Sequence, residues 1–361
     1  MPQTDYRITL AETQIIKAFA ILAMLVHHLF YENPEYGLGA YSLAISGKVC
    51  VALFVFLSGY GMATTFPKNV KGRLNAAKTF FFFLGKRYAK FYMNYWVVFA
   101  ITVPIGIFCF GRTLEIAYGT SDGLLIKFIS DLFGLRGFDS YNITWWFNEL
   151  ILVLWLLFPL FYLAMRNMVT SICVTVFLFV NPGGILDVSE IFANCLSIYM
   201  LPFALGIGMA LHAECINKAF NAIPQKVLLG ILALATFVFL FLRGVPLFSE
   251  FSYFRVDPFA TVALALFVVC LCRTSKLKFA PLQFIGKHSM NMYLTHTFVL
   301  GYFFHDFIYG LKYPILMFLT IFGISMLISV VIEFAKSKLG FYRLQGRVAS
   351  LISRQIISTL N

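Results

Sequence analysis

The chain has 361 residues, of which 60% are hydrophobic and only 12% are charged, and 42 of them are phenylalanine. A soluble globule needs more polar surface than this composition supplies, so the sequence predicts an integral membrane protein. The net charge of +12 does not indicate nucleic-acid binding, because the basic residues lie between apolar runs and not on one polar domain.

About ten segments are apolar and long enough to cross a bilayer. They lie near residues 13–31, 43–65, 91–110, 145–165, 168–185, 195–213, 225–243, 257–273, 288–308 and 312–335. The fifth is the weakest, because Asn181-Pro182-Gly183-Gly184 interrupts it. The first has no small-residue cleavage site after it and is expected to stay as a membrane helix. The sequence predicts an all-α polytopic bundle that forms a single membrane-embedded domain over residues 1–361, with no separate soluble domain.

Loop charges predict the orientation of these segments. The stretch 66–90 is rich in Lys and Arg, whereas the preceding loop carries Glu32 and Glu35 and no cation. The basic side is expected to face the cytoplasm. Alternation then places the basic tail after residue 335 inside, and Asp187, Glu190 and the loop 111–144 outside. Both termini are therefore predicted to be cytoplasmic.

Two cations lie within the first apolar segment. Lys17 and His28 are eleven positions apart, so on a helix they share one face at a separation of about 16 Å. Ionisable groups inside a membrane usually face the protein interior or a wet cavity, which makes this face a candidate functional path. Two plainer interpretations stay open: Lys17 can snorkel to the headgroups, and His28 can be an interfacial histidine. His27 points about 100° away and is expected to be structural.

Further polar residues lie at the start of the third segment and in the fourth and ninth. Arg87 and Lys90 are one helical turn apart at the cytoplasmic start of the third, where they either bind a ligand or only fix the topology. Glu149 is near the outer end of the fourth, as a site residue able to pair with Lys48 or as a rim carboxylate. Tyr293 and His296 share a helix face with Ser289.

The seven cysteines lie in or beside apolar segments without ligand-like clustering. Neither a disulfide framework nor a metal site is expected.

Cations on the cytoplasmic side and an imidazole deeper in the membrane suit coenzyme A as a ligand. Its phosphates need Arg and Lys, and its pantetheine arm is long, thin and mostly uncharged. An acyl thioester could then meet His28, which can take a proton from an attacking hydroxyl or carry the acyl group itself.

Five stretches occur in a characteristic order. They are Lys17 to His28 in the first segment; Leu53-Phe54-Val55-Phe56-Leu57-Ser58-Gly59-Tyr60; the basic and aromatic run 87–96; Trp146-Phe147 through Phe158-Pro159; and the run 284–296, from Phe284-Ile285-Gly286-Lys287 to Tyr293-Leu294-Thr295-His296. Together they resemble acyltransferase family 3, integral-membrane O-acyltransferases that modify cell-surface polysaccharides and related acceptors. Two positions depart from the family pattern: Lys17 replaces the commoner Arg, and Met93 stands where Pro is frequent.

The resemblance implies an O-acyltransferase of the inner or plasma membrane that moves an acyl group, acetyl above others, from cytoplasmic acetyl-CoA to a sugar hydroxyl. The acceptor would be a surface polysaccharide or a lipid-linked glycan. Expected roles are CoA binding for Lys17, Arg87, Lys90 and Ser58, and catalysis for His28, Glu149, Tyr293 and His296, without metal. A glycolipid transporter or flippase, whose polar residues line a translocation route, is the alternative. Membrane lipids are expected partners and nucleic acid is not; the sequence leaves the oligomeric state open.

Overall fold

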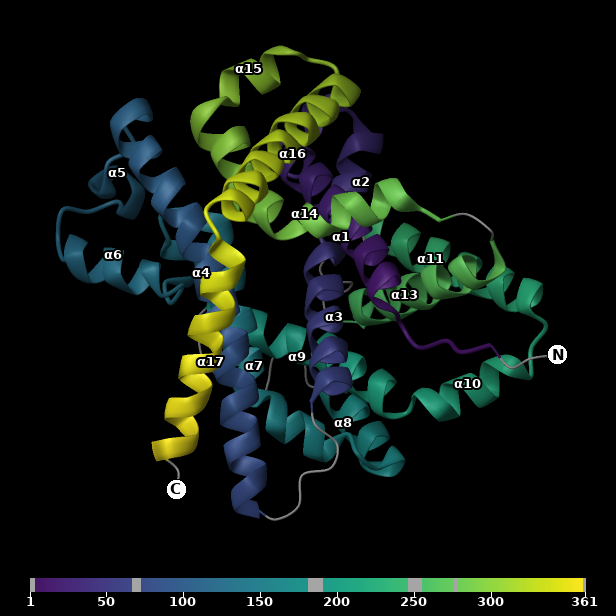
Figure 1. The fold of residues 1–361 in the computed structure, drawn as a ribbon. Coiled ribbons are helices and arrows are strands. Elements are labelled where there is room, and N and C mark those ends of the chain that lie inside the picture. The colour runs from purple at the N-terminus through teal and green to yellow at the C-terminus, as the bar shows by residue number, and fades with distance from the viewer. Residues whose placement is uncertain (1–3, 67–72, 181–190, 246–254, 276–277, 360–361) are drawn as a thin grey trace. The chain divides into compact units, whose positions relative to one another are not determined.

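The computed structural model describes residues 4–66, 73–180, 191–245, 255–275 and 278–359 (Figure 1). All regular secondary structure in these ranges is helical, which confirms the all-α prediction. The elements of the first half are α1 (Leu10–Phe30), η1 (Pro34–Tyr36), α2 (Leu38–Gly47), α3 (Val49–Thr65), α4 (Arg73–Phe110), α5 (Leu114–Tyr118), α6 (Leu124–Leu132), η2 (Gly137–Asp139), η3 (Ile143–Trp145) and α7 (Trp146–Ala164). Those of the second half are α8 (Met168–Val180), α9 (Ile191–Leu211), α10 (Ala213–Asn221), α11 (Gln225–Gly244), α13 (Asp257–Thr274), α14 (Ala280–Thr297), η5 (Phe298–Phe303), α15 (His305–Gly310), α16 (Pro314–Lys338) and α17 (Phe341–Thr359).

The chain divides into two compact units, each built from three separate stretches. Unit 1 is Met1–Thr64, Leu160–Ser289 and Leu311–Phe322; unit 2 is Thr65–Pro159, Met290–Gly310 and Gly323–Asn361. The unit boundaries fall inside α7, α14 and α16, so these helices contribute residues to both. Whether the chain acts as the single domain predicted from sequence stays a prediction.

Seven helical stretches in the described part of the chain are long and apolar enough to span a membrane. They are Leu10–Phe30, Leu38–Thr65, Ala77–Phe110, Ile143–Ala164, Gln225–Gly244, Asp257–Thr274 and Pro314–Lys338. Each corresponds to a predicted segment, which confirms the membrane-helical character of the protein.

The other three predicted segments differ from simple spans, so the count of about ten is not confirmed. The described part of the fifth is the 13-residue helix α8, which is shorter than the length that a spanning helix needs, and the interrupting motif at 181–184 lies outside the described residues. The sixth bends by 74° between α9 and α10, and counting that bent pair as one span gives eight. The ninth begins inside α14 and continues through η5 into α15, and its part of α14 includes the polar residues Asn291 and His296. The cytoplasmic placement of both termini rests on loop charges and stays a prediction; several of those charged residues, Asp187 and Glu190 among them, lie outside the described residues.

In unit 1, α1 begins with a capping box that the apolar pattern alone did not indicate. The Thr9 hydroxyl accepts the Glu12 N–H, and the Glu12 carboxylate accepts the Thr9 N–H at 2.8 Å. Glu12 is buried, and Arg273 of α13 forms an ion pair with it at 2.9 Å. The helix thus begins three residues before the predicted segment 13–31, and Glu12 lies within its first turn.

Helices α3 and α9, also in unit 1, touch through glycine. A Cβ atom added at Gly59 would overlap the backbone carbonyl oxygen of Phe203, and one added at Gly206 would overlap that of Phe56. Small residues permit this backbone approach between membrane helices, where dispersion replaces the hydrophobic driving force. The Ser58-Gly59 motif thus has a packing function at its glycine.

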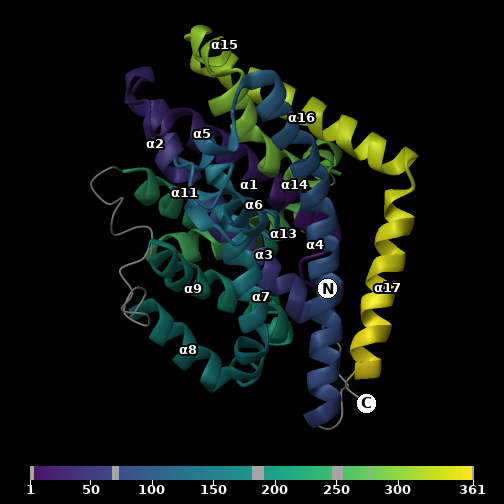
Figure 2. The ribbon, with the colours of Figure 1, turned by 90° about the vertical axis from the view of Figure 1, so that its left-hand side faces the viewer.

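Unit 2 is centred on aromatic side chains of α4, of η3 directly before α7, and of η5 directly after α14. Tyr95, Phe99, Trp145 and Phe298 are almost completely buried and pack together, and the Trp145 indole N–H donates to the Leu294 carbonyl at 3.1 Å. The long helix α17 packs against α4, as Figure 2 also shows. These contacts hold the Trp146–Pro159 part of α7 and the second half of α14 together.

We expect Gly59→Ala to destabilise the protein by about 1–3 kcal/mol, because the new methyl group meets backbone that cannot rotate away. Gly61→Ala on the same helix is the matched control, since a Cβ there meets nothing within 4 Å. Thermal unfolding of both variants in detergent, followed by size-exclusion chromatography, measures the difference. Equal melting temperatures for the two variants would contradict the proposed α3–α9 contact.

Candidate functional site

The eight residues predicted from the sequence fall in both units. Lys17, His28 and Ser58 belong to unit 1, whereas Arg87, Lys90, Glu149, Tyr293 and His296 belong to unit 2.

His28 lies near the C-terminal end of α1, beside a second imidazole with a different function. The Nδ1 atom of His27 lies 2.8 Å from the Ala44 carbonyl oxygen of α2, and the His27 ring is buried. Gly47 brings α2 against the same turn of α1, because a Cβ there would press on the Ala23 carbonyl and the His27 side chain. His27 thus links α1 to α2, which fits the structural role expected of it from the sequence. The ring of His28 lies 5.1 Å from that of His27 and keeps partial solvent exposure.

A charged cluster lies close to His28 in unit 1. Lys48 occupies the break between α2 and α3, its amino group is 5.8 Å from the Tyr31 ring, and it is near enough to His28 for their charges to interact. Lys48 also interacts electrostatically with Arg243 and Asp257. These two form a fully buried ion pair at 2.8 Å between α11 and α13. A buried pair of this kind costs desolvation energy and is kept where its geometry is fixed.

Lys17 and Ser58 are both half-buried, on α1 and α3 respectively. Gly286 of the late Gly-Lys motif packs against the backbone of Gln14, one turn before Lys17, so closely that a Cβ would overlap the Gln14 carbonyl. This contact brings the motif-bearing start of α14 against the Lys17 end of α1. The CoA-binding roles of Lys17 and Ser58 stay predictions.

Arg87 and Lys90 lie on α4 of unit 2 in different environments. The Arg87 guanidinium is partly buried and lies 4.9 Å from the centre of the Trp155 ring of α7, a cation–π contact. Lys90 is exposed, and its backbone carbonyl accepts a hydrogen bond from Gln345 of α17 at 3.4 Å. The two cations are thus one turn apart but differ in access to solvent.

Tyr293 and His296 join a polar network with the start of α7. The Tyr293 hydroxyl donates to the Thr144 carbonyl at 2.9 Å and lies 3.3 Å from the Asn148 side-chain oxygen. His296 Nδ1 is 2.7 Å from the Tyr293 carbonyl, and its Nε2 is 3.1 Å from the Thr297 hydroxyl. Because a carbonyl can only accept, Nδ1 carries the proton and Nε2 accepts from Thr297. This arrangement fixes the ring, so His296 is suited to orient its neighbours.

Glu149 lies in the first turn of α7 and is half-buried. The partial positive charge of a helix N-terminus favours a carboxylate at this place. Glu149 directly follows Asn148, whose side chain belongs to the hydrogen-bond network around Tyr293. Its predicted pairing with Lys48 stays a prediction.

The structure also shows polar residues that sequence reasoning did not select. Asn148 is fully buried, and its Nδ2 group has no hydrogen-bond partner among the described residues. Lys336 is almost fully buried and binds Glu333 at 2.9 Å, Asn94 at 3.0 Å and Asn291 at 3.2 Å. The available signal for Asn148 was an amide within an apolar run, whereas Lys336 directly follows the tenth predicted segment and was assigned to the basic tail. Within the ranges that the structure covers, no group of three or more His, Cys, Asp and Glu side chains is arranged to hold a metal ion.

Apolar spans combined with buried ion pairs are typical of a polytopic membrane protein whose charged side chains lie between its helices. The model of the Acyl_transf_3 family, described as an acyltransferase domain, matches residues 11–334. The chain therefore belongs to acyltransferase family 3, as its five motifs predict, and is a membrane acyltransferase. No curated protein and no solved structure matched it.

Asp131 of α6 is a buried carboxyl group in the segment that precedes α7. Its Oδ2 accepts the Tyr141 N–H at 2.6 Å and the Tyr118 hydroxyl at 3.1 Å, and its side chain has no exposed surface. Burial outweighs these bonds and raises the pKa of Asp131 to about 6. The folded state therefore holds the proton more tightly than the unfolded state, whose carboxyl titrates near 3.8.

Because this pKa is raised on folding, the stabilising contribution is complete below pH 4 and is lost as the pH rises through about 6. We expect Asp131→Asn, which keeps an acceptor oxygen but carries no charge, to be more stable than the parent at pH 7.5 by on the order of 1–3 kcal/mol, and similar to it at pH 4.5. The exposed Asp122→Asn is the control and should change little at either pH. Thermal unfolding across this pH range tests it; an Asp131→Asn effect that does not depend on pH would contradict it.

Proposed function

We propose that this acyltransferase is an O-acetyltransferase that uses cytoplasmic acetyl-CoA to acetylate a sugar hydroxyl of a surface polysaccharide or lipid-linked glycan, in the inner or plasma membrane. The observation that carries the chemistry is the pair of adjacent imidazoles on α1. His27 is bound to the Ala44 carbonyl, while His28 keeps accessible surface and lies near the charged side chain of Lys48.

In the proposed reaction the His28 imidazole takes the proton of the acceptor hydroxyl as its oxygen attacks the thioester carbonyl carbon. The new C–O ester bond forms, the C–S bond breaks, and the CoA thiolate takes up the proton to leave as the thiol. In the second form of the mechanism the imidazole nitrogen of His28 attacks the thioester carbonyl carbon, the C–S bond breaks, and CoA leaves as the thiol with the imidazole proton. The acceptor hydroxyl then attacks the acetyl-imidazole, the C–N bond breaks, and the imidazole takes up the hydroxyl proton. Both forms need the same imidazole at the same place.

Donor binding is assigned to Arg87, Lys90, Lys17 and Ser58. Phosphate groups favour Arg, whose planar fork makes paired hydrogen bonds, and Lys as a point charge. Lys90 is exposed, and Arg87 is held by its cation–π contact with Trp155. Both positions suit a ligand that approaches α4 from its N-terminal end.

Acceptor orientation is assigned to Glu149, Tyr293 and His296. The Tyr293 hydroxyl and the neighbouring buried amide of Asn148 supply hydrogen-bonding groups of the kind that sugar hydroxyls require. The fixed His296 ring holds the Thr297 hydroxyl in this network. Membership in an acyltransferase family gives no support to the transporter alternative.

We expect His28→Ala to lower acetyl transfer by at least about a hundredfold, because a general base or acyl carrier is removed, while the protein still folds in the membrane. The matched control is His305→Ala, an exposed histidine at the start of α15. Mass spectrometry of surface glycan from cells that express each variant measures the transfer, and released CoA is quantified by chromatography because the seven cysteines would react with thiol reagents. Normal glycan acetylation by His28→Ala would remove His28 from the mechanism. A wild-type protein that binds glycan lipid but never consumes acetyl-CoA would overturn the proposed function.

A further inference from the structure

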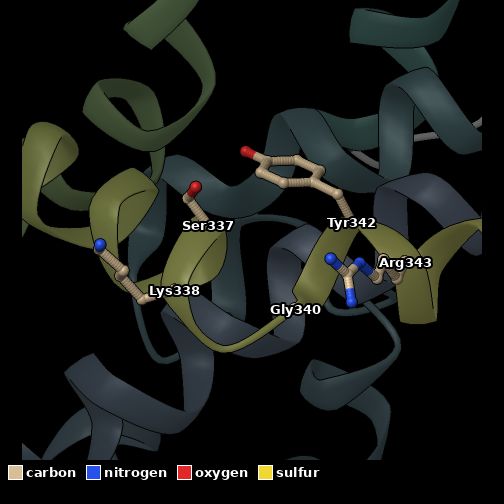
Figure 3. A pocket seen from close by; sticks show the side chains of 5 residues that line it. All are labelled: Ser337, Lys338, Gly340, Tyr342 and Arg343. Carbon is tan, nitrogen blue, oxygen red and sulfur yellow. The ribbon is translucent and has the colours of Figure 1, made fainter.

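Two surfaces of unit 2 have no role in the reaction described above: a pocket at the turn from α16 to α17, and one face of α6. The pocket, shown in Figure 3, holds about 240 Å³ and is lined by Ser337, Lys338, Gly340, Tyr342 and Arg343. Two of its polar groups are engaged within the chain, because the Tyr342 hydroxyl donates to Glu333 and the Lys338 ammonium lies 5.5 Å from the centre of the Phe334 ring. The pocket therefore gives no indication of a ligand, whereas α6 does.

Helix α6, which lies beside α4, carries apolar side chains on two opposite faces (Figure 1). On the inner face, Phe128 and Leu132 pack against the aromatic cluster of unit 2, and the Phe128 ring lies 5.4 Å from that of Phe99. On the outward face, four large side chains lie uncovered within an arc of about 100°. Their exposed fractions are 70% for Leu125, 73% for Ile126, 45% for Ile129 and 42% for Phe133. Adjacent exposed apolar residues on so short a helix indicate a surface that has a partner.

The C-terminal end of α6 has its backbone carbonyls satisfied by side chains of α4. The last carbonyls of a helix have no partner within it and commonly bind water. Three aromatic residues of α4 donate to them instead: Tyr95 to Asp131 at 2.7 Å, Trp96 to Leu132 at 2.8 Å, and Tyr92 to Phe133 at 3.1 Å. Hydrocarbon requires such internal pairing, because lipid chains offer no hydrogen-bonding group.

The neighbouring spans place this end of α6 at the depth of the membrane. Trp96 lies 14 residues before the end of the apolar stretch Ala77–Phe110, or about 21 Å along the helix. Its indole is 39% exposed and lies 6.3 Å from the Phe133 ring. A Cβ atom added at Gly134 would lie 3.3 Å from that of Asn148, which is inside the apolar stretch Ile143–Ala164 of α7. The outward face of α6 therefore continues the uncovered surface of a membrane span.

The opposite end of α6 is on the aqueous side, since Ser121 and Asp122 directly before it are exposed. The helix has nine residues and is about 14 Å long, too short to cross a hydrocarbon core of about 30 Å. It therefore enters one leaflet with its C-terminal end leading and does not reach the other side.

We propose that the outward face of α6 is inserted in the bilayer and binds the acyl chains of phospholipids. The sequence predicts an external loop over residues 111–144, so the inserted helix changes the topology of this segment. An uncovered face of Leu, Ile and Phe beside the less exposed Lys127 and Ser130 is typical of helices that lie in a membrane interface. The interaction does not depend on acetyl transfer and is independent of the proposed function.

The test is photo-crosslinking of the full chain in phosphatidylcholine nanodiscs. The photoreactive residue benzoylphenylalanine replaces Ile126 on the outward face or, as the matched control, Phe128 on the inner face of the same helix. A second control replaces Asp306 of α15, whose side chain is fully exposed. After irradiation, mass spectrometry is expected to show a gain of one phosphatidylcholine molecule on the peptide with the probe at position 126. The probe at position 128 should link to its own chain, and the probe at position 306 should gain little lipid.

A crosslink from position 126 to a second copy of the chain would assign the outward face to a protein interface and overturn the proposal. A lipid yield at position 126 no higher than at position 306 would place the face in water and overturn it as well. If the variant at position 126 does not elute as a single folded species, Ile129 is replaced instead. The same lipid adduct is expected there, because both residues lie on the outward face.

Discussion

The structure depends on one constraint: a polar group within an apolar span must find its partner inside the protein, because hydrocarbon offers none. Hydroxyl groups find such a partner on their own helix: Thr102 donates to the Val98 carbonyl, and Thr236 donates to the Leu232 carbonyl. Charged groups need an opposite charge as well, because a carbonyl alone does not neutralise them. That partner lies on another helix for Arg243, which pairs with Asp257 within unit 1, and one turn away on the same helix for Lys336, which pairs with Glu333.

Average hydropathy predicted the spans well where a helix is continuous and uniformly apolar. It did not reveal the break at Lys48, because one lysine between two apolar runs hardly changes a window average, although it ends α2 and separates it from α3. The 74° bend between α9 and α10 lies at His212, close to residue 213 where the sixth segment was predicted to end, but the pattern did not predict the helix that follows it. Breaks of this kind depend on local backbone geometry, which composition does not encode.

Candidate site residues were predictable where periodicity alone places them. Tyr293 and His296 were assigned to one helix face, and the structure joins them through the Tyr293 carbonyl. Their partners Thr144 and Asn148 come from a segment about 150 residues earlier, and only tertiary packing brings it there. Lys336 is the clearest case: a lysine at the end of a span is normally a topology signal, yet three polar side chains enclose it.

The π-helical segment η5 explains how two residues of the same part of the chain, Thr297 and Tyr302, both contact the segment before α7. Bonds from residue i+5 to residue i, as from the Phe304 N–H to the Val299 carbonyl at 3.1 Å, bring residues five apart onto one face. Thr297 and Tyr302 are five apart, and both contact η3, directly before α7. The Thr297 hydroxyl lies 2.9 Å from the Thr144 hydroxyl, and the Tyr302 hydroxyl accepts the Ile143 N–H at 3.4 Å. An uninterrupted α-helix would turn Tyr302 away from this segment. The extra residue per turn therefore adds a second anchor directly after His296, which holds that end of α14 rigid.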